Sequence, residues 1–245
     1  MPGTEQCLKK LVVLVVGASS GMGRATAIAS ATAGAEVILA SRNEAALALV
    51  QAALEDQGSS VLAVPTDATD AAAVARLVEQ VVAKYGRIDV VVNTVGTNIP
   101  KRALSETTSE SWGMMVSINL TSAFNITKAV VPVFRQQQGG LIIHVSSSAA
   151  KKPDASGIAY QATKAGVVGI AHGTMEEERK HGIRTTVIFP GLTDTPMVLK
   201  RPVATPPEVL ARALQPEDVA AAALFVMSLP ARAHVPELVI CPSNL

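Results

Sequence analysis

Two residues in the second half of the chain could carry out acid–base chemistry. Tyr160 and Lys164 lie in a segment of small residues, Ala159–Gly173, whose composition predicts a helix. Residues at i and i+4 share one helical face, so the lysine ammonium could lie near the phenol. A neighbouring positive charge favours phenolate over a phenol of pKa about 10, as proton exchange with an alcohol requires. Such pairs are also common on helix surfaces, so the spacing alone leaves both interpretations open.

Three serines precede this pair along the chain. Ser146, Ser147 and Ser148 follow directly after a short apolar run. A serine hydroxyl at the carboxyl end of a strand could orient a substrate oxygen towards the phenol. Serine is also favoured in ordinary turns, and the spacing alone does not select among the three.

A glycine-rich turn near the start of the chain could hold a phosphate. The apolar run Leu11–Val16 leads into Gly17-Ala18-Ser19-Ser20-Gly21-Met22-Gly23, and a helix-like segment follows. Glycines allow a tight turn and close approach to a pyrophosphate, and the helix amino terminus offers free N–H groups. The spacing is G-x-x-x-G-x-G rather than G-x-G-x-x-G, and an ordinary Gly/Ser loop is the alternative. The loop has no lysine placed as in a Walker motif, so we do not expect an ATPase.

Ser41 and Arg42 follow the second apolar run, where an adenosine ribose would lie. An acidic residue there binds ribose hydroxyls, whereas a basic residue accommodates a 2′-phosphate. The first acidic residue is Glu44, so Arg42, assisted by Ser41, favours NADP(H) over NAD(H). Alternatively, Ser41 caps a helix and Arg42 is a solvated surface charge.

The elements that must position these residues alternate between short apolar runs and helix-like segments. The predicted strands are Leu11–Val16, Glu36–Ala40, Ser60–Val64, Ile88–Asn93, Leu141–Ser146, Arg184–Phe189 and Glu237–Cys241. The segments between them that are long enough for helices include Gly23–Ala33, Ala45–Gln57, Ala71–Tyr85 and Pro216–Leu229. This order predicts a Rossmann-like α/β fold: a doubly wound parallel sheet of about seven strands with helices on both faces. Such sheets bind ligands at the carboxyl ends of their strands.

Helix start signals and one irregular segment complete the outline. Ser41 with Glu44, and Thr107 with Glu110, have the spacing of a capping box, and Pro216 suits a first helical turn. We expect residues 1–245 to form a single domain. The Pro- and Thr-rich segment 192–207 is a candidate lid over the substrate.

Composition excludes several classes of function. The formal net charge of +1 gives no sign of a nucleic-acid partner, and no segment suggests a membrane span, so we expect a cytoplasmic protein. The two cysteines, Cys7 and Cys241, have no disulfide or zinc spacing, and we expect reduced, buried thiols.

Several other residues are interpreted structurally. His144 lies within a predicted strand and is expected to be a satisfied core histidine; the histidines and cysteines show no ligand spacing, so we expect no metal site. The charged run 176–180 is interpreted as a solvated helix end, and Trp112 with Met114 and Met115 as core or interface packing.

The combined motifs resemble the short-chain dehydrogenase/reductase family, over nearly the whole chain from Leu11 to about Ile240. The matching features, in family order and spacing, are the glycine turn, Asn93-Thr94-Val95-Gly96, Asn119, Ser147, Tyr160, Lys164 and Pro190-Gly191. The resemblance implies that Ser147, thirteen residues before the tyrosine, is the family serine. It implies that Tyr160 is the acid/base, that Lys164 holds the ribose and lowers the tyrosine's pKa, and that Asn119 props a water in a proton relay.

The resemblance also implies a set of cofactor contacts. Asp67 would lie beside the adenine, Asn93 would steady the central strand, and Thr193 and Thr195 would lie near the nicotinamide carboxamide. The full expected set is Gly17, Ser19, Ser20, Gly21, Met22, Gly23, Ser41, Arg42, Asp67, Ala68, Asn93, Val95, Tyr160, Lys164, Pro190, Gly191, Thr193 and Thr195.

The chain departs from the family pattern at three places. Val16 stands where threonine is usual, which would loosen a turn hydrogen bond. Asn93-Thr94-Val95-Gly96 replaces the commoner Asn-Asn-Ala-Gly, and the tail lacks the frequent Asp-Gly-Gly ending.

These features predict an NADP(H)-dependent oxidoreductase that moves a hydride between nicotinamide and a carbonyl or secondary alcohol. A catalytically silent dinucleotide-binding regulatory protein is the alternative, and a dehydratase or epimerase that uses the same cofactor is a third. The substrate, a small molecule, would lie among residues 95–98, 148–154 and 192–207. The resemblance implies a homodimer or homotetramer, and the small residues Ala162, Ala165, Gly169 and Gly173 would let partner helices approach closely.

Overall fold

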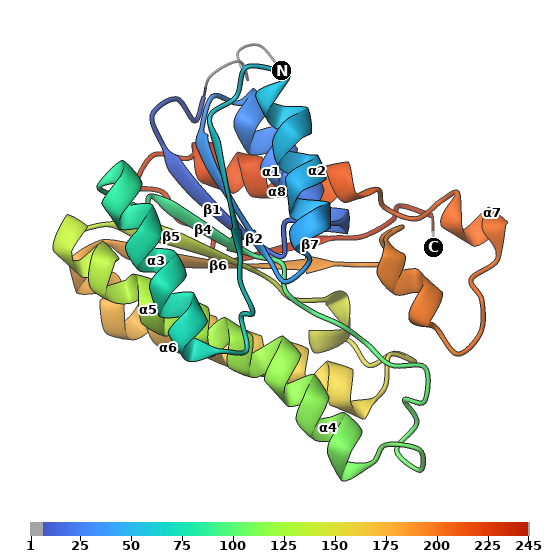
Figure 1. Cartoon of the computed structure of the whole chain (residues 1–245). Coiled ribbons are helices and arrows are strands. Elements are labelled where there is room, and N and C mark those ends of the chain that lie inside the picture. Colours follow the sequence, from blue (N-terminus) through green and yellow to red (C-terminus); the bar gives the residue numbers. More distant parts are fainter. Residues whose placement is uncertain (1–6, 245) are drawn as a thin grey trace.

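Seven parallel strands form the centre of the computed structural model, which describes residues 7–244 (Figure 1). Their order across the sheet is β3-β2-β1-β4-β5-β6-β7, which confirms the predicted doubly wound sheet. The strands are β1 (Val12–Val16), β2 (Glu36–Ser41), β3 (Val61–Pro65), β4 (Val90–Asn93), β5 (Gly140–Val145), β6 (Ile183–Pro190) and β7 (Glu237–Ile240). The strand order reverses between β1 and β4, which is where sheets of this kind bind ligands.

Helices cover both faces of the sheet (Figure 1). One face carries α1 (Gly21–Thr32), α2 (Glu44–Glu55) and α8 (Pro216–Ser228); the other carries α3 (Ala71–Tyr85), α5 (Ser122–Gln137) and α6 (Ile158–Glu178). Successive strand side chains point to opposite faces, so Val13 and Val15 of β1 enter one core and Val12 and Leu14 enter the other. Burial on both sides explains why the strands are continuous apolar runs.

Helix caps differ from two of the sequence predictions. The cap of α2 is Asn43, whose side chain accepts from Ala46 N at 3.0 Å, and Ser41 is therefore not the cap. The capping box of α4 (Ser109–Val116) is Thr108 with Ser111, not Thr107 with Glu110. Several residues that can cap a helix lie within a few positions of each helix start. A cap needs an extended backbone, which the sequence spacing does not reveal. Pro216 does occupy the first turn of α8, as predicted.

One continuous helical segment is longer than the sequence patterns indicated. It joins α4, a π-helical turn (Ser117–Thr121) and α5 into Ser109–Gln137, 29 residues. By length and composition alone it could cross a membrane, which corrects the expectation that no segment could; 44% of its most apolar stretch is buried. The buried residues of its α5 part, among them Ile126, Val130 and Phe134, pack on the sheet.

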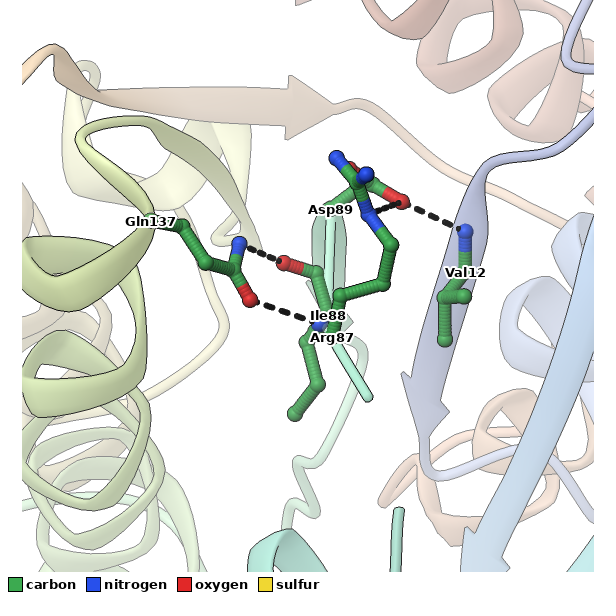
Figure 2. A network of polar contacts seen from close by, with 5 residues as sticks. All are labelled: Val12, Arg87, Ile88, Asp89 and Gln137. Carbon is green, nitrogen blue, oxygen red and sulfur yellow. Dashed lines mark hydrogen bonds and ion pairs between the residues drawn. The ribbon is translucent and has the colours of Figure 1, made fainter. Parts of the chain in front are cut away.

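A polar network fixes the amino-terminal edge of the sheet, opposite the strand ends that will hold the site (Figure 2). The Asp89 carboxylate accepts from Val12 N at 2.8 Å and from Arg87 Nε at 3.0 Å. The Gln137 side chain satisfies both backbone groups of Ile88, accepting from its N–H at 3.0 Å and donating to its carbonyl at 2.7 Å. The network links β1, the start of β4 and the end of α5.

Two interpretations of individual side chains need correction. Glu178 is not part of a solvated helix end, because it is 3% exposed and accepts a hydrogen bond of 2.7 Å from Arg135 Nε. Cys7 and Cys241 are free thiols, but both are exposed rather than buried. Met115 belongs to the core as expected, whereas Trp112 is 41% exposed.

Candidate active site

Two adjoining cavities open at the carboxyl ends of the central strands. The turn cavity, of about 290 Å³, is lined by the glycine turn 17–23, by Ser41 and Arg42, and by the loops 66–69 and 94–97. The tyrosine cavity, of about 470 Å³, is lined by Tyr160, the three serines 146–148 and parts of the segment 190–203. Met22, Thr195 and Met197 line both, so the two form one continuous site.

The glycine turn has a geometry that larger residues could not adopt. Gly17 has a φ of 92°, in the region that favours glycine. A side chain at Gly23 would bring its Cβ within 2.2 Å of the Gly17 carbonyl oxygen. The cap residue of α1, Ser20, makes no side-chain capping bond. The turn therefore presents the amino terminus of α1 to the cavity, as a phosphate site needs.

Thr94 links the loop after β4 to the end of β1. Its hydroxyl and its backbone N–H both donate to the carbonyl oxygen of Val16 at 2.9 Å. A Cβ on Gly17 or on Gly23 would lie only 2.5 Å from the Thr94 Oγ1 atom, so Thr94 leaves no room for a side chain at either position. A hydroxyl therefore does bind at this turn, although it comes from the loop after β4 and not from position 16. Sequence reasoning missed Thr94, although its place after Asn93 was a signal.

Ser41 and Arg42 lie at the outer end of the turn cavity. With Asn43 capping α2, the Ser41 hydroxyl is free to pair with Ser19 Oγ at 2.8 Å, which ties the end of β2 to the glycine turn. Arg42 is exposed and lines the same cavity. Both positions suit contacts to the adenosine side of a nucleotide.

Asp67 lies in the loop after β3. Its Oδ1 accepts from the backbone N–H of Thr69 at 2.9 Å and from the Thr69 hydroxyl at 2.8 Å. Burial opposes its ionisation, but these hydrogen bonds and the charge of Arg42 together lower the pKa of Asp67 below its ordinary value. Asn125 on α5 donates to the carbonyls of Ala68 and Thr69, which holds the loop in place. The loop thus presents an ionised carboxylate and a fixed backbone to the turn cavity.

Tyr160 and Lys164 project from one face of α6, as their spacing predicted. The Lys164 Nζ atom lies 5.9 Å from the centroid of the Tyr160 ring and donates to the Val145 carbonyl at 3.0 Å. Lys164 is 3% exposed, and burial lowers its pKa from 10.5 to about 8. The lysine therefore stays largely protonated at neutral pH although it is buried.

The pKa of Tyr160 moves in the opposite direction to the sequence expectation. Burial raises it above the ordinary value of 10.0, and Asp154 adds to the rise. A hydrogen bond with Ser147 and the charge of Arg102 lower it, but do not reverse the effect. The expectation considered only the cation; it omitted the cost of burying a phenolate. In the free protein the phenol is protonated at neutral pH.

The structure distinguishes the roles of Ser146 and Ser147, which the sequence spacing could not do. Ser146 is buried, and its hydroxyl donates to the Lys164 carbonyl at 2.8 Å, which joins β5 to α6. Ser147 lines the tyrosine cavity together with Tyr160, and its hydroxyl lowers the pKa of the phenol. It also accepts from Ala149 N at 3.2 Å. Ser147 is therefore the serine placed to act with the phenol, and Ser146 positions the helix.

Asn119 lies in the π-helical turn and is fully buried. Its Oδ1 accepts from Thr97 N at 2.7 Å, while its Nδ2 donates to the Thr97 carbonyl at 3.0 Å and to Thr163 Oγ1 at 3.1 Å. The side chain thereby links the loop after β4 to α6. A π turn often marks a functional position in a helix. Thr97 and Thr163 were missed by sequence reasoning, and no pattern pointed to them.

Asn93 and His144 form a buried pair between β4 and β5. Asn93 Oδ1 accepts from Val95 N at 3.0 Å, so its Nδ2 donates to His144 Nδ1 at 3.1 Å. His144 Nε2 then donates to Thr127 Oγ1, at 3.3 Å. Burial lowers the pKa of His144 to about 4, so the ring is neutral. This confirms His144 as a satisfied core histidine, and it anchors Asn93, whose side chain holds Val95 of the turn cavity.

The segment after β6 crosses the opening of both cavities. Pro190 ends the strand, and Gly191 N donates to the Ile240 carbonyl at 2.8 Å. Thr193 is buried and donates to the Gly191 carbonyl at 3.1 Å, while Thr195 lies against Gly21 of the glycine turn. Thr193 and Thr195 both line the tyrosine cavity, next to Tyr160 and Ser147.

The candidate lid 192–207 is fastened at its middle. It contains a 3-10 helix, Pro196–Lys200, and leads to α7 (Pro207–Leu210). The Lys200 Nζ atom donates to Thr97 Oγ1 at 2.7 Å, and Arg102 Nη2 donates to the Lys200 carbonyl at 2.8 Å. Sequence reasoning gave no role to Arg102 or Lys200, which lie in loops without a diagnostic motif.

Comparisons with known proteins agree with this geometry. Residues 11–204 match the family model described as short chain dehydrogenase. A 3-oxoacyl-[acyl-carrier-protein] reductase of Thermotoga maritima is 35% identical over 227 residues, covering 90% of this chain and 92% of that protein. An uncharacterized oxidoreductase of Staphylococcus haemolyticus is 32% identical over 231 residues, covering 94% of this chain and 96% of that protein.

Solved structures show the same fold. An alcohol dehydrogenase of the archaeon Thermococcus sibiricus, complexed with 5-hydroxy-NADP, has a TM-score of 0.86 at 26% identity, covering 96% of this chain and 97% of that one. A serine dehydrogenase in a closed form, complexed with NADP+, has a TM-score of 0.88 at 28% identity and covers 96% of each chain.

Proposed function

Because the chain belongs to the short-chain dehydrogenase/reductase family, we propose that it reduces a carbonyl group to a secondary alcohol with NADPH. Family membership shows that the chain is an NAD(P)-dependent oxidoreductase. The proposal concerns the direction of the reaction, which is reduction, and the preference for NADPH over NADH. The observation that carries it is that Tyr160 and Ser147 line a cavity continuous with the glycine turn, while the buried Lys164 ammonium lies 5.9 Å from the centroid of the Tyr160 ring.

The turn cavity fits a dinucleotide. A Cβ at Gly17 or Gly23 would lie 2.5 Å from Thr94 Oγ1, so these glycines let the turn pack closely against the loop after β4. The turn lines the cavity, and the start of α1, whose cap Ser20 makes no side-chain bond, offers N–H groups to a pyrophosphate. Asp67 and Val95 line this cavity, where they would border the adenosine and the middle of the dinucleotide, and Thr193 and Thr195 line the adjoining cavity next to Tyr160. When bound, the nicotinamide supplies the hydride, and the protein supplies binding and orientation.

The side chains in the tyrosine cavity suit proton donation. Ser147 is placed to hold the carbonyl oxygen towards Tyr160, and the raised pKa keeps the phenolic proton in place at neutral pH. The Lys164 ammonium, 5.9 Å from the ring centroid, stabilises the negative charge that develops when Tyr160 releases its proton. Asn119 holds the loop around Gly96, where an added Cβ would meet Lys164 Nζ at 2.9 Å. The asparagine thus acts by positioning the lysine's surroundings.

The preference for NADP(H) rests on Arg42. It is the basic side chain at the end of β2, and Ser41, released from capping, lies beside it. A guanidinium can pair with a 2′-phosphate in a bidentate manner. The complexes of the Thermococcus sibiricus alcohol dehydrogenase with 5-hydroxy-NADP and of serine dehydrogenase with NADP+ support this choice.

The test is to mix the purified protein with NADPH or NADH and a panel of ketones, and to follow nicotinamide absorbance. We expect oxidation of NADPH by at least one ketone and a higher kcat/KM with NADPH than with NADH. Tight NADPH binding without oxidation by any ketone would instead support the alternative, a catalytically silent regulatory protein.

We also propose a homodimer or homotetramer formed through α6. Its small residues are exposed along one face, and Phe124 of the neighbouring α5 is 50% exposed. Two copies could therefore bring these helices close together. Light scattering that gives the mass of a single chain would contradict this assembly.

A further inference from the structure

Two arginines from separate loops line the tyrosine cavity. Arg102 belongs to the loop after β4 and Arg201 to the segment after β6. Much of the remaining wall beyond Tyr160 and the serines is apolar: Leu192, Met197, Val198, Pro202 and Val203. Neither arginine lines the turn cavity, so neither is placed to hold the pyrophosphate or the adenosine of a dinucleotide.

Arg102 is held in a fixed position with one nitrogen left over. Its Nε donates to the Ile99 carbonyl at 3.1 Å and its Nη2 to the Lys200 carbonyl at 2.8 Å. Gly157 packs so closely on its backbone that an added Cβ would lie 2.5 Å from the Arg102 carbonyl oxygen. Within residues 7–244, Nη1 makes no hydrogen bond. A fixed guanidinium with a free donor is suited to binding an anion.

The charge of Arg102 affects the Tyr160 phenol. It is one of the influences that lower the pKa of Tyr160, against the larger effect of burial. Because Arg102 and Tyr160 also line the same cavity, one small molecule could contact both.

Arg201 completes the positive end of the cavity. It is exposed, and its Nη1 donates to Thr205 Oγ1 at 2.8 Å. After burial, the charge of Arg201 is the next influence that lowers the pKa of Arg102, as expected for two close cations. Asp154 is the carboxylate that lines this cavity, and its Oδ1 already accepts from Ser156 N at 2.8 Å. One positive charge therefore remains without a counter-charge.

We propose that the substrate is an oxo acid, whose carboxylate binds Arg102 and Arg201 while its carbonyl lies between Ser147 and Tyr160. This specificity rests on the function proposed above. Arg102 and Arg201 come from separate loops, and Arg102 already donates to the Lys200 carbonyl of the lid segment. A carboxylate between the two arginines would add a second link between the lid and the loop after β4. The apolar wall would contact the carbon chain of the substrate.

The test compares oxo acids with their uncharged methyl esters as substrates of the protein with NADPH. The pairs are acetoacetate, 4-oxopentanoate and 5-oxohexanoate, each with its methyl ester, so the distance between carboxylate and ketone varies. We expect one acid to have a kcat/KM well above that of its ester. Arg201→Gln should raise the KM for that acid about 10- to 100-fold and leave the ester within about twofold, because a hydrogen bond to a charged group is lost.

Matched variants separate binding from structure. Lys101→Gln removes an exposed cation next to Arg102 that lines neither cavity, and should change neither substrate's kinetics. Arg102→Gln should act on the acid as Arg201→Gln does, but it also loosens the contact with Lys200, so Arg201→Gln is the primary variant.

Three results would overturn the proposal in distinguishable ways. If every ester is reduced as well as its acid, or if Arg201→Gln weakens both equally, the oxo-acid specificity is wrong although the reductase function stands. If neither these acids and esters nor any other ketone of the panel oxidises NADPH, the proposed function fails. The arginine site is then tested by calorimetric binding of pentanoate to the complex of the protein with NADP+. Binding that Arg201→Gln does not weaken would disprove the site.

Discussion

The ammonium of Lys164 lies 5.9 Å from the centre of the Tyr160 ring and donates its hydrogen bond to the Val145 carbonyl. The lysine is therefore anchored to the end of β5 beside the phenol. Burial affects the two groups in opposite senses: it lowers the pKa of the lysine and raises that of the tyrosine. Both effects disfavour the charged form, and they leave a protonated phenol next to a protonated amine at neutral pH.

Removing the phenol tests the acid directly. Tyr160→Phe should lower kcat by about 100- to 10,000-fold, the range that general acid–base catalysis contributes. The matched control is Tyr85→Phe, the other tyrosine of the chain. In the described part of the chain the Tyr85 hydroxyl is buried without a hydrogen-bond partner, so this variant should keep full activity and unfold at the same or a slightly higher temperature. Equal rates for Tyr160→Phe and the parent would disprove the role of the phenol.

Carbonyl reduction should weaken as pH rises through about 8. Lys164 has a pKa of about 8 in the free protein, so its charge is present below that pH and lost above it. Without the charge, the phenolate that forms on proton release is less stable. The dependence of kcat/KM on pH reports groups of the free enzyme and is the measurement to make. Since the pKa of Tyr160 lies above its ordinary value, a decline near pH 8 belongs to the lysine. A profile that stays flat well beyond this pH would contradict the assignment.

Cofactor preference should depend on Arg42. Arg42→Asp should raise the KM for NADPH about 10- to 100-fold through loss of a charge-assisted contact and through repulsion of the 2′-phosphate, with a much smaller effect on NADH. Arg24→Gln is the matched control, since Arg24 is exposed on α1 and lines neither cavity. An unchanged ratio of the two cofactors in Arg42→Asp would exclude a phosphate contact.

His144 should make the protein sensitive to acid. Its pKa is about 4 when folded, against 6.5 for an ordinary histidine. Between these values the unfolded chain binds the extra proton, so the free energy of unfolding falls as pH drops from 6.5 towards 4. The full effect of such a shift is about 3 kcal/mol. Urea unfolding at both ends of this range should show a smaller pH-dependent loss for His144→Gln than for the parent. Identical losses would show that other groups dominate.

The network at the amino-terminal edge of the sheet should affect stability without affecting catalysis. Gln137→Leu leaves the buried N–H and carbonyl of Ile88 without their partners, which should cost about 2 kcal/mol of unfolding free energy. Because this edge lies opposite the cavities, KM and kcat should stay within about twofold of the parent. Gln136→Leu, an exposed neighbour on α5, is the control for both measurements. A loss of activity in the folded Gln137→Leu variant would contradict this prediction, because it would show that the amino-terminal edge of the sheet affects catalysis.

Local patterns in the sequence determined the sheet, the glycine turn and the spacing of Tyr160 and Lys164. These features depend on periodicity and on residue type: an apolar run buried on both faces forms a strand, and i, i+4 residues share a helical face. The family resemblance added Ser147, which the serine spacing could not choose from the residues alone. The structure explains that choice, because Ser146 uses its hydroxyl on the Lys164 carbonyl.

Only the tertiary structure decided which distant groups meet. The Thr94 hydroxyl binds the Val16 carbonyl at the end of β1, and Asn43 rather than Ser41 caps α2. Arg102 and Arg201 line one cavity although their loops are far apart in the chain. The tertiary structure also decided that the pKa of Tyr160 is raised rather than lowered. Desolvation and hydrogen bonding depend on what surrounds a group in space, and loops without periodic patterns carry no local signal of that environment.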